Sequence, residues 1–327
     1  MESTGRSPQG PANWALATTV VGLFLIWSNS FAANEYLLAG SARRFDWQGL
    51  TVARYVLAAA VCWLYCLGWR RRETLALLRR YPWRLLVCGA LAVPSYNFCL
   101  AWGQQQGMPA SLASVTTTLA PLFIMVLATF FLSERPPAAL WLGLVVAGLG
   151  MAVIGSADRA APAGSYSWAV AISAGAPLSW ALFSVISKPM TDRVSPLLWT
   201  YLSVALGGLM VAPLTLGPAG RQWAELDGAG WVALGYLALP CTVVGYAIWT
   251  GLLRHLPATV VGLTVFLNPP LATVSKAALA RLLPETFVFA ISPREWLGAA
   301  IVLTGLSVGL GRRLFSGLWR RRAARSS

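Results

Sequence analysis

Apolar residues along this chain gather in blocks of about 20 residues, and short polar links separate the blocks. A helix of roughly 20 apolar residues spans the hydrocarbon core of a bilayer. The blocks predict ten membrane-crossing helices, over residues 14–34, 50–69, 83–102, 109–132, 138–154, 167–186, 195–216, 230–253, 257–283 and 295–314. We therefore expect an all-α membrane protein in which little chain remains for a soluble domain.

The two halves of the chain repeat one another at an offset of about 150 residues. Four pairs of positions recur in the same order: Trp27 with Trp180, Trp83 with Trp231, Pro121 with Pro269, and Trp141 with Trp296. Each half holds five predicted helices, and an odd number makes the second copy enter the membrane from the opposite side. Inverted repeats are typical of transporters that bind substrate near the midplane and work by alternating access. We place the two repeats at residues 1–160 and 161–327.

The basic residues set the expected orientation. The net charge of +14 does not indicate nucleic-acid binding, because the charges lie in short links and in the tail over residues 312–325. If the N-terminus is cytoplasmic, 17 of the 25 basic residues lie inside and 6 outside. By the positive-inside rule, this bias predicts two cytoplasmic termini in a bacterial inner-membrane protein, with a basic cytoplasmic tail.

Aromatic and amide side chains near the predicted midplane are the candidate substrate contacts. They are Trp27, Asn29, Tyr96, Asn97, Trp180, Tyr246 and Asn268, with Trp249 at a similar depth. Amides are costly in hydrocarbon unless they face water or a partner. Trp27 and Trp180 either line a cavity or serve in packing. The other repeat-related tryptophans, such as Trp141 and Trp296, are expected at the membrane interfaces.

Two cations and two repeat-related prolines within predicted helices are further candidates. Lys276 and Arg54 could each bind a substrate carboxylate, although long basic side chains also snorkel to the membrane surface, which we favour for both. Lys276 is kept as a candidate contact. Pro121 and Pro269 each free a backbone carbonyl one turn earlier, which predicts either a hinge beside the cavity or a packing kink.

The acidic residues all lie in links or near helix ends, and the lone histidine, His255, lies in a predicted link. Proton-driven carriers usually place a carboxylate inside the membrane, so the pattern favours export without proton coupling. No helix offers an acidic pair, a Ser–His pair or a metal-binding group. We therefore expect no catalytic site, metal or cofactor, and we interpret the five cysteines as small buried hydrophobes.

Several features together resemble a known family. They are Trp27-Ser-Asn-Ser-Phe31, Arg54, Pro121 with Ser133-Glu134-Arg135, and Asn268-Pro269 with Pro284-Glu285. Their order resembles the EamA-type carriers of the drug/metabolite transporter superfamily, and the aromatic content is similar to that of its YddG-type aromatic amino-acid exporters. The resemblance implies ten helices, cytoplasmic termini and export of amino acids or related metabolites. Glu285 departs from the repeat by three residues, and Thr200 stands at the second-half position of Arg54.

The sequence therefore predicts an exporter of small amphipathic metabolites, amino acids including aromatic ones, that acts in the lipid bilayer. A multidrug exporter of the same architecture is the alternative, and it would need an intramembrane carboxylate to attract cations. An intramembrane enzyme is disfavoured for want of catalytic groups. Small-residue spacings at Gly148-x3-Ala152 and Gly305-x3-Gly309 predict close helix packing. We expect a monomer, with a homodimer as the alternative.

Overall fold

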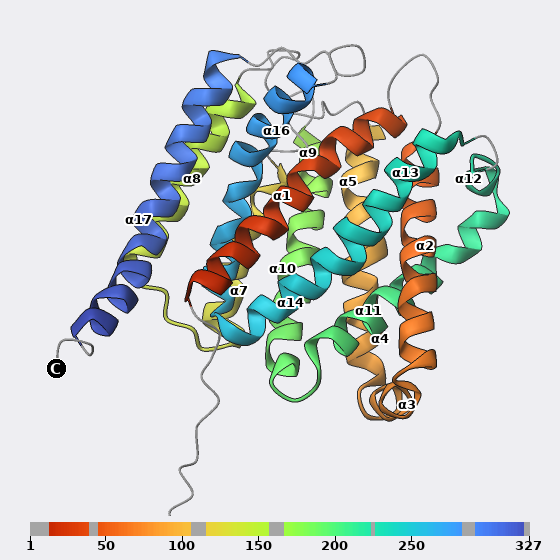
Figure 1. Cartoon of the computed structure of the whole chain (residues 1–327). Helices are drawn as coiled ribbons and strands as arrows, with labels where there is room; N and C mark the ends of the chain where they lie inside the picture. Colours follow the sequence, from red (N-terminus) through yellow and green to blue (C-terminus); the bar gives the residue numbers. More distant parts are fainter. Residues whose placement is uncertain are drawn as a thin grey trace, which may run out of the picture.

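The computed structural model describes residues 13–38, 45–105, 116–156, 167–223, 226–282 and 292–323. Within these ranges every regular element is helical (Figure 1). The first half contains α1 (Asn13–Leu38), α2 (Trp47–Gly68), α3 (Arg71–Arg80), α4 (Pro82–Ala90), η1 (Leu91–Ser95), α5 (Tyr96–Gln105), α7 (Ala120–Phe131) and α8 (Ala138–Gly155). The second half contains α9 (Ser167–Ser173), α10 (Gly175–Thr191), α11 (Pro196–Val211), η2 (Ala212–Leu216), α12 (Pro218–Arg221), α13 (Gly228–Tyr236), η3 (Leu237–Val244), α14 (Gly245–His255), α15 (Ala258–Leu263), η4 (Thr264–Leu267), α16 (Asn268–Leu282) and α17 (Pro293–Ala323).

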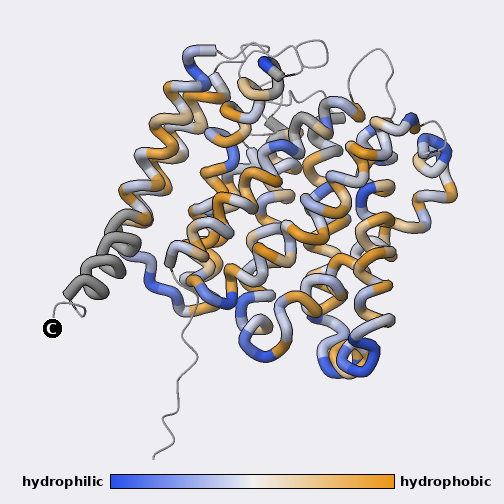
Figure 2. The backbone as a smooth tube through the Cα atoms, viewed as in Figure 1, coloured by the Kyte–Doolittle hydropathy of each residue, from blue (hydrophilic) through white to orange (hydrophobic). Residues whose placement is uncertain are grey.

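Four stretches are long and apolar enough to cross a membrane: Trp47–Gly68, Pro82–Leu100, Pro196–Leu216 and Gly228–His255. Shorter apolar helices cover Trp14–Ser30, Ala120–Phe131, Ala138–Ile154 and Ala258–Ala272. In Figure 2, hydrophobic residues predominate in the body of the molecule, and hydrophilic residues gather at its lower end, around α3 and the turn after α10. The all-helical membrane fold is therefore confirmed, whereas the number of ten crossings stays a prediction.

The two halves run in opposite directions. In Figure 1, α1 climbs through the molecule and its counterpart α10 descends, while α2 descends and α11 climbs. The start of α1 and the end of α17 lie on the side of the molecule that also carries α3. We call this side the α3 face. The directions agree with an inverted repeat, since equivalent helices cross the molecule in opposite senses.

The observed helices differ from the predicted ones after residue 69 and within the predicted helix over 167–186. The predicted link after residue 69 contains α3, an amphipathic helix whose Thr74 donates a hydrogen bond to the carbonyl of Cys66 at 2.8 Å. The predicted helix over 167–186 is divided at Ala174 into α9 and α10, and α10 continues to Thr191. The start of the predicted helix over 109–132 lies outside the described residues. These differences arise where a polar face or a local break interrupts the apolar pattern.

Helix α11 packs against α2 and against α4 with η1, and glycines permit the close approach. A Cβ on Gly208 would lie 2.4 Å from the Cβ of Ala59 in α2, and one on Gly207 would lie 2.5 Å from the carbonyl oxygen of Gly89 in α4. The largest cluster of buried hydrophobic residues surrounds this contact and extends to α1, α10 and α14. The crossing of α2 and α11 therefore joins the two halves.

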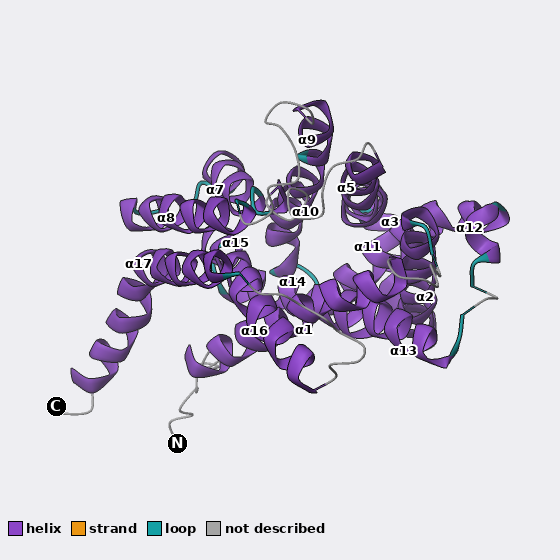
Figure 3. Ribbon diagram, turned by 90° about the horizontal axis from the view of Figure 1, so that it is seen from above, coloured by secondary structure: helices purple, strands orange, loops and turns teal. Residues whose placement is uncertain are grey.

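Helices α8 and α17 pair along one edge of the molecule (Figure 1 and Figure 3). A Cβ on Gly305 would lie 2.5 Å from the amide nitrogen of Ala147, so Gly305 serves close packing as expected. On α8 the expected small-residue face is wrong, because a Cβ on Gly148 would meet no heavy atom within 4 Å. Gly143 and Gly150 make the contact instead, since they lie on the side of α8 that faces α17.

Candidate functional site

Aromatic rings from both halves meet in one cluster in the interior. Trp27 of α1 lies with its ring centroid 5.8 Å from those of Trp180 in α10 and Trp249 in α14, and 6.4 Å from that of Tyr246. Trp180 and Tyr246 are 4.9 Å apart, and Tyr96 of α5 lies 6.1 Å from Trp180. Most of these pairs are edge-to-face or tilted, as the quadrupoles of aromatic rings prefer. The predicted residues Trp27, Tyr96, Trp180 and Tyr246 are therefore neighbours.

Each half contains a π-helical stretch beside this cluster. These stretches are η1 with Pro94 and η3 with Pro240. A proline lacks the N–H of a regular helix, and π-bulges often occur at functional sites. The indole nitrogen of Trp27 donates to the carbonyl oxygen of Cys241 in η3 at 2.9 Å. Gly245 permits this approach, because a Cβ there would lie 2.5 Å from that nitrogen.

Arg54 is directed into the molecule rather than toward the membrane surface. Its Nε donates to Oγ1 of Thr242 at 2.8 Å, and Thr242 lies midway along the rod Gly228–His255. Its guanidinium carbon lies 5.2 Å from the ring centroid of Tyr55, whose hydroxyl is 2.8 Å from that of Tyr246. The favoured interpretation of Arg54 as a snorkelling residue is therefore wrong, because η3 offers it a polar partner at membrane depth.

The structure shows different surroundings for the predicted amide contacts, and it does not describe the side chain of the predicted lysine contact. Asn29 and Asn97 donate to the carbonyls of Leu25 and Val93, four residues earlier in their own chain segments. The side-chain amide oxygen of Asn268 is buried and has no hydrogen-bond partner among the described residues. The backbone of Lys276 belongs to α16, and its side chain lies outside the described residues. Their contact with substrate stays a prediction.

Pro121 and Pro269 each lie in the first turn of a helix. The amide of Leu119 donates to the carbonyl of Thr116 just before α7, and the 3-10 helix η4 precedes α16 in the same way. A proline is tolerated in the first turn, where its missing N–H would have no helical partner. Helix geometry thus changes immediately before both prolines. Whether either position acts as a hinge stays a prediction.

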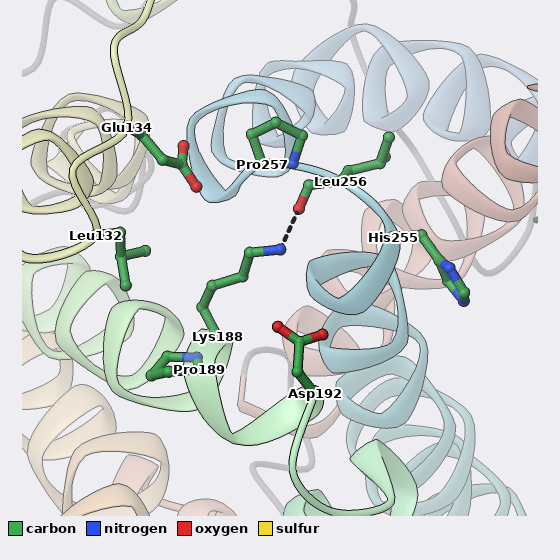
Figure 4. Close-up of a pocket in the computed structure, with 8 residues that line it drawn as sticks. All are labelled: Leu132, Glu134, Lys188, Pro189, Asp192, His255, Leu256 and Pro257. Carbon is green, nitrogen blue, oxygen red and sulfur yellow. Dashed lines mark hydrogen bonds between the residues drawn. The ribbon is translucent and has the colours of Figure 1, made fainter.

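A cluster of polar side chains, separate from the aromatic cluster, lies where α14 ends on the α3 face (Figure 1). Figure 4 shows its side chains. A cavity of about 470 Å³ is lined there by Leu132, Glu134, Lys188, Pro189, Asp192, His255, Leu256 and Pro257. The Glu134 carboxylate accepts from the amides of Ala258 at 2.7 Å and Thr259 at 3.0 Å. A carboxylate is stabilising at this position because the N-terminus of a helix carries partial positive charge.

Lys188 completes the same corner from α10. Its Nζ donates to the carbonyl of Leu256 at 2.9 Å and to that of Leu253, at the C-terminal end of α14. Ser133 adopts a left-handed conformation (φ 55°), which ends α7 and directs the chain toward Glu134. Our sequence analysis missed this arrangement. The sequence feature that could have indicated it is the short Leu256-Pro257 link between two apolar helices. Such a link leaves backbone N–H and C=O groups at the two helix ends without intrahelical partners.

The carboxylates that the structure describes all lie at helix ends or in links. Asp46 and Asp227 cap the N-termini of α2 and α13, and Asp192 follows α10. Glu73 belongs to α3, where it forms an ion pair with Arg70 at 2.7 Å. The structure describes no group of three or more His, Cys, Asp or Glu side chains that could hold a metal. Over this part of the chain, the interior site is therefore aromatic and cationic.

Apolar helices in two oppositely directed halves, closing around an aromatic interior, define a polytopic membrane protein. The model of the EamA-like transporter family matches residues 14–156 and again residues 167–310. The chain belongs to the EamA-like transporter family and carries two copies of its domain. It is thus a transporter and not an enzyme. The resemblance to EamA-type carriers is confirmed, whereas the YddG-type subgroup stays a prediction.

Curated relatives cover most of the chain. A probable terminal-alkyne amino-acid exporter of Streptantibioticus cattleyicolor is 28% identical over 315 residues, which is 96% of each chain. A probable amino-acid metabolite efflux pump of Salmonella typhimurium is 28% identical over 231 residues, 66% of this chain and 75% of that one. The uncharacterized inner membrane transporter YedA of Escherichia coli K12 is 25% identical over 295 residues, 90% of each. These similarities support a multi-pass inner-membrane protein.

The fold is shared with a solved crystal structure. It superposes with a TM-score of 0.73 at 21% sequence identity, covering 93% of this chain and 99% of the other. The helical arrangement described above is therefore that of an experimentally observed protein fold.

Proposed function

We propose that this transporter exports small amphipathic metabolites, namely amino acids including aromatic ones. It does so by alternating access, with ten membrane crossings and both termini in the cytoplasm. The observation that carries the proposal is the aromatic cluster at the meeting of the two halves. Trp27 comes from the first half, and Trp180, Tyr246 and Trp249 come from the second. A substrate held there contacts both halves, as alternating access requires.

The chemistry of the cluster supports an aromatic or otherwise apolar side chain on the substrate. Ligand sites are typically lined by aromatic side chains with a few polar groups that orient the ligand. A flat substrate ring that enters the cluster would pack against the rings of Trp27 and Trp180. Arg54 of α2 bonds to Thr242 in η3, the residue after the one whose carbonyl accepts from Trp27. Two relatives carry names that refer to amino-acid export, which favours the same substrate class.

The proposal includes transport without proton coupling. A proton-coupled cycle needs a group that titrates between the two access states, and an arginine cannot serve because its guanidinium does not lose its proton in a protein. The described carboxylates lie outside the helix interiors, at caps and links. We expect the carrier to equilibrate its substrate rather than accumulate it against a gradient.

The test is transport by the purified protein in proteoliposomes. Vesicles are loaded with a panel of amino acids, and efflux is followed with and without an imposed pH gradient. We expect aromatic and other apolar amino acids to leave the vesicles at the same rate with and without the pH gradient. A protonophore should change neither rate. Efflux of cationic drugs without any amino acid would contradict the proposal, and uphill accumulation driven by the pH gradient would contradict the coupling.

A further inference from the structure

We propose that Arg54 is the anion-binding group of the translocation site, so that the carrier selects substrates bearing a carboxylate. This inference rests on the proposed export of amphipathic metabolites and names the substrate group that the site requires. In this proposal, Arg54 on α2, in the first half of the chain, binds the carboxylate of the substrate. The aromatic cluster binds the apolar part of the substrate.

The first argument is the unbalanced charge of Arg54. Among the residues that the structure describes, no carboxylate forms an ion pair with it, and Thr242 accepts only from its Nε. A guanidinium presents five N–H donors and cannot lose its proton in a protein. A charge at membrane depth is costly unless it is paired or hydrated. An anion that enters the site would supply the missing partner.

The second argument is the place of Arg54 relative to the aromatic rings. Arg54 bonds to Thr242, and the indole of Trp27 bonds to the carbonyl of the preceding residue, Cys241. Adjacent residues of η3 therefore hold the cation and the central ring of the cluster. Tyr55 continues the connection, because its hydroxyl lies 2.8 Å from that of Tyr246. This adjacency favours a substrate whose charged and apolar parts are close together.

The third argument is the shape of the available donors. Arg54 is half-buried, and its Nε is occupied by Thr242. The two terminal nitrogens of a guanidinium form a planar fork that matches the two oxygens of a carboxylate. The bond to Thr242 fixes the plane of that fork. The rival role for Arg54 is purely structural, as a tether that holds η3 against α2.

The experiment compares three indole compounds as competitors of tryptophan counterflow in proteoliposomes at zero membrane potential. Tryptophan carries ammonium and carboxylate, tryptamine lacks the carboxylate, and indole-3-propionate lacks the ammonium. We expect wild-type protein to bind tryptamine about 10-fold to 100-fold more weakly than tryptophan, the range of a charge-assisted hydrogen bond. Indole-3-propionate should compete far better than tryptamine.

Three variants separate recognition from tethering. Arg54→Gln should bring the ratio of the inhibition constants of tryptamine and tryptophan close to one. Arg54→Lys should retain part of the preference for a carboxylate. Thr242→Val removes the tether and leaves the cation, so it should keep the preference for a carboxylate. Retention of the full preference in Arg54→Gln, or its loss in Thr242→Val, would overturn the inference in favour of the structural role.

The outcomes also separate this inference from the proposed function. Equal inhibition of wild-type counterflow by all three compounds would overturn the role of Arg54 and leave amino-acid export standing. Absence of counterflow with tryptophan and every other amino acid of the panel would overturn the proposed function and this inference together. If Arg54→Gln does not fold, wild type and Arg54→Lys still decide the matter.

Discussion

Single residues of the interior show where sequence patterns were informative. Trp27 and Trp180 stood out because they occupy equivalent positions in the two repeats, and their rings indeed lie 5.8 Å apart. Arg54 was misinterpreted, because its long side chain could point outward as easily as inward. Its true direction depends on the π-helical turn that presents Thr242, and hydrophobic periodicity does not show such a turn. Glu134 was likewise visible only as part of a motif, without its role at α15.

The aromatic pair supports a prediction on substrate affinity. Trp27→Phe and Trp180→Phe retain much of the buried volume and lose the indole, whereas Trp27→Ala and Trp180→Ala remove most of the ring contacts. Loss of a ring contact, worth about 0.5–1.5 kcal/mol, lowers affinity a few-fold to about tenfold. Counterflow measured against substrate concentration should show the larger loss for the alanine variants.

The matched controls for the aromatic pair are Trp141→Ala and Trp296→Ala. These two side chains are 37% and 48% exposed on α8 and α17, away from the cluster. They should leave affinity unchanged at equal reconstitution levels. If all four alanine variants weaken transport to the same extent, Trp27 and Trp180 are packing residues and not substrate contacts.

At the scale of elements, the apolar blocks predicted where helices lie but not how their backbones are wound. Pro94 and Pro240 lie within predicted helices, but a proline is compatible with a kink, a break or a π-bulge, so its presence alone does not indicate a π-helical stretch. The same limit applied to Gly148, where spacing alone selected the wrong face of α8. An eight-residue π stretch such as η3 shifts the following side chains around the helix, so residue spacing no longer tells which face they occupy.

The glycine contact between α8 and α17 gives a prediction on stability. Gly305→Ala places a Cβ 2.5 Å from the backbone nitrogen of Ala147 and should lower the free energy of unfolding by about 1–3 kcal/mol, the usual cost of overpacking. Gly148→Ala meets open space and should leave stability unchanged or slightly higher, because alanine favours a helix. Thermal unfolding in detergent measures both, and equal effects would refute this helix contact.

For the whole molecule, the repeat in the sequence predicted the opposite directions of the two halves, because five helices per copy leave no other arrangement. The two family matches, over 14–156 and 167–310, agree with two repeats, while a boundary at residue 160 stays a prediction. The orientation in the membrane also stays a prediction. The prediction of which face is cytoplasmic rests on the distribution of basic residues.

The orientation can be tested by cysteine labelling in intact cells, on a background without the five native cysteines. Gln105→Cys, at the end of α5, should react with an impermeant maleimide, because that end lies opposite the α3 face (Figure 1). Leu75→Cys, in the exposed part of α3, should be protected until the cells are permeabilised. The reverse labelling pattern would place both termini outside.

The tight contact of three indoles also has a spectroscopic consequence. Trp27, Trp180 and Trp249 lie with centroids 5.4–5.8 Å apart, close enough for their electronic transitions to couple. Such coupling is visible in near-ultraviolet circular dichroism, a signal that depends on fixed tertiary packing. A substrate that enters between the rings must separate them and so reduce the signal. The three tryptophans therefore serve as an intrinsic probe of binding. Titrating unlabelled protein with candidate substrates should change the near-ultraviolet circular dichroism before any flux is measured.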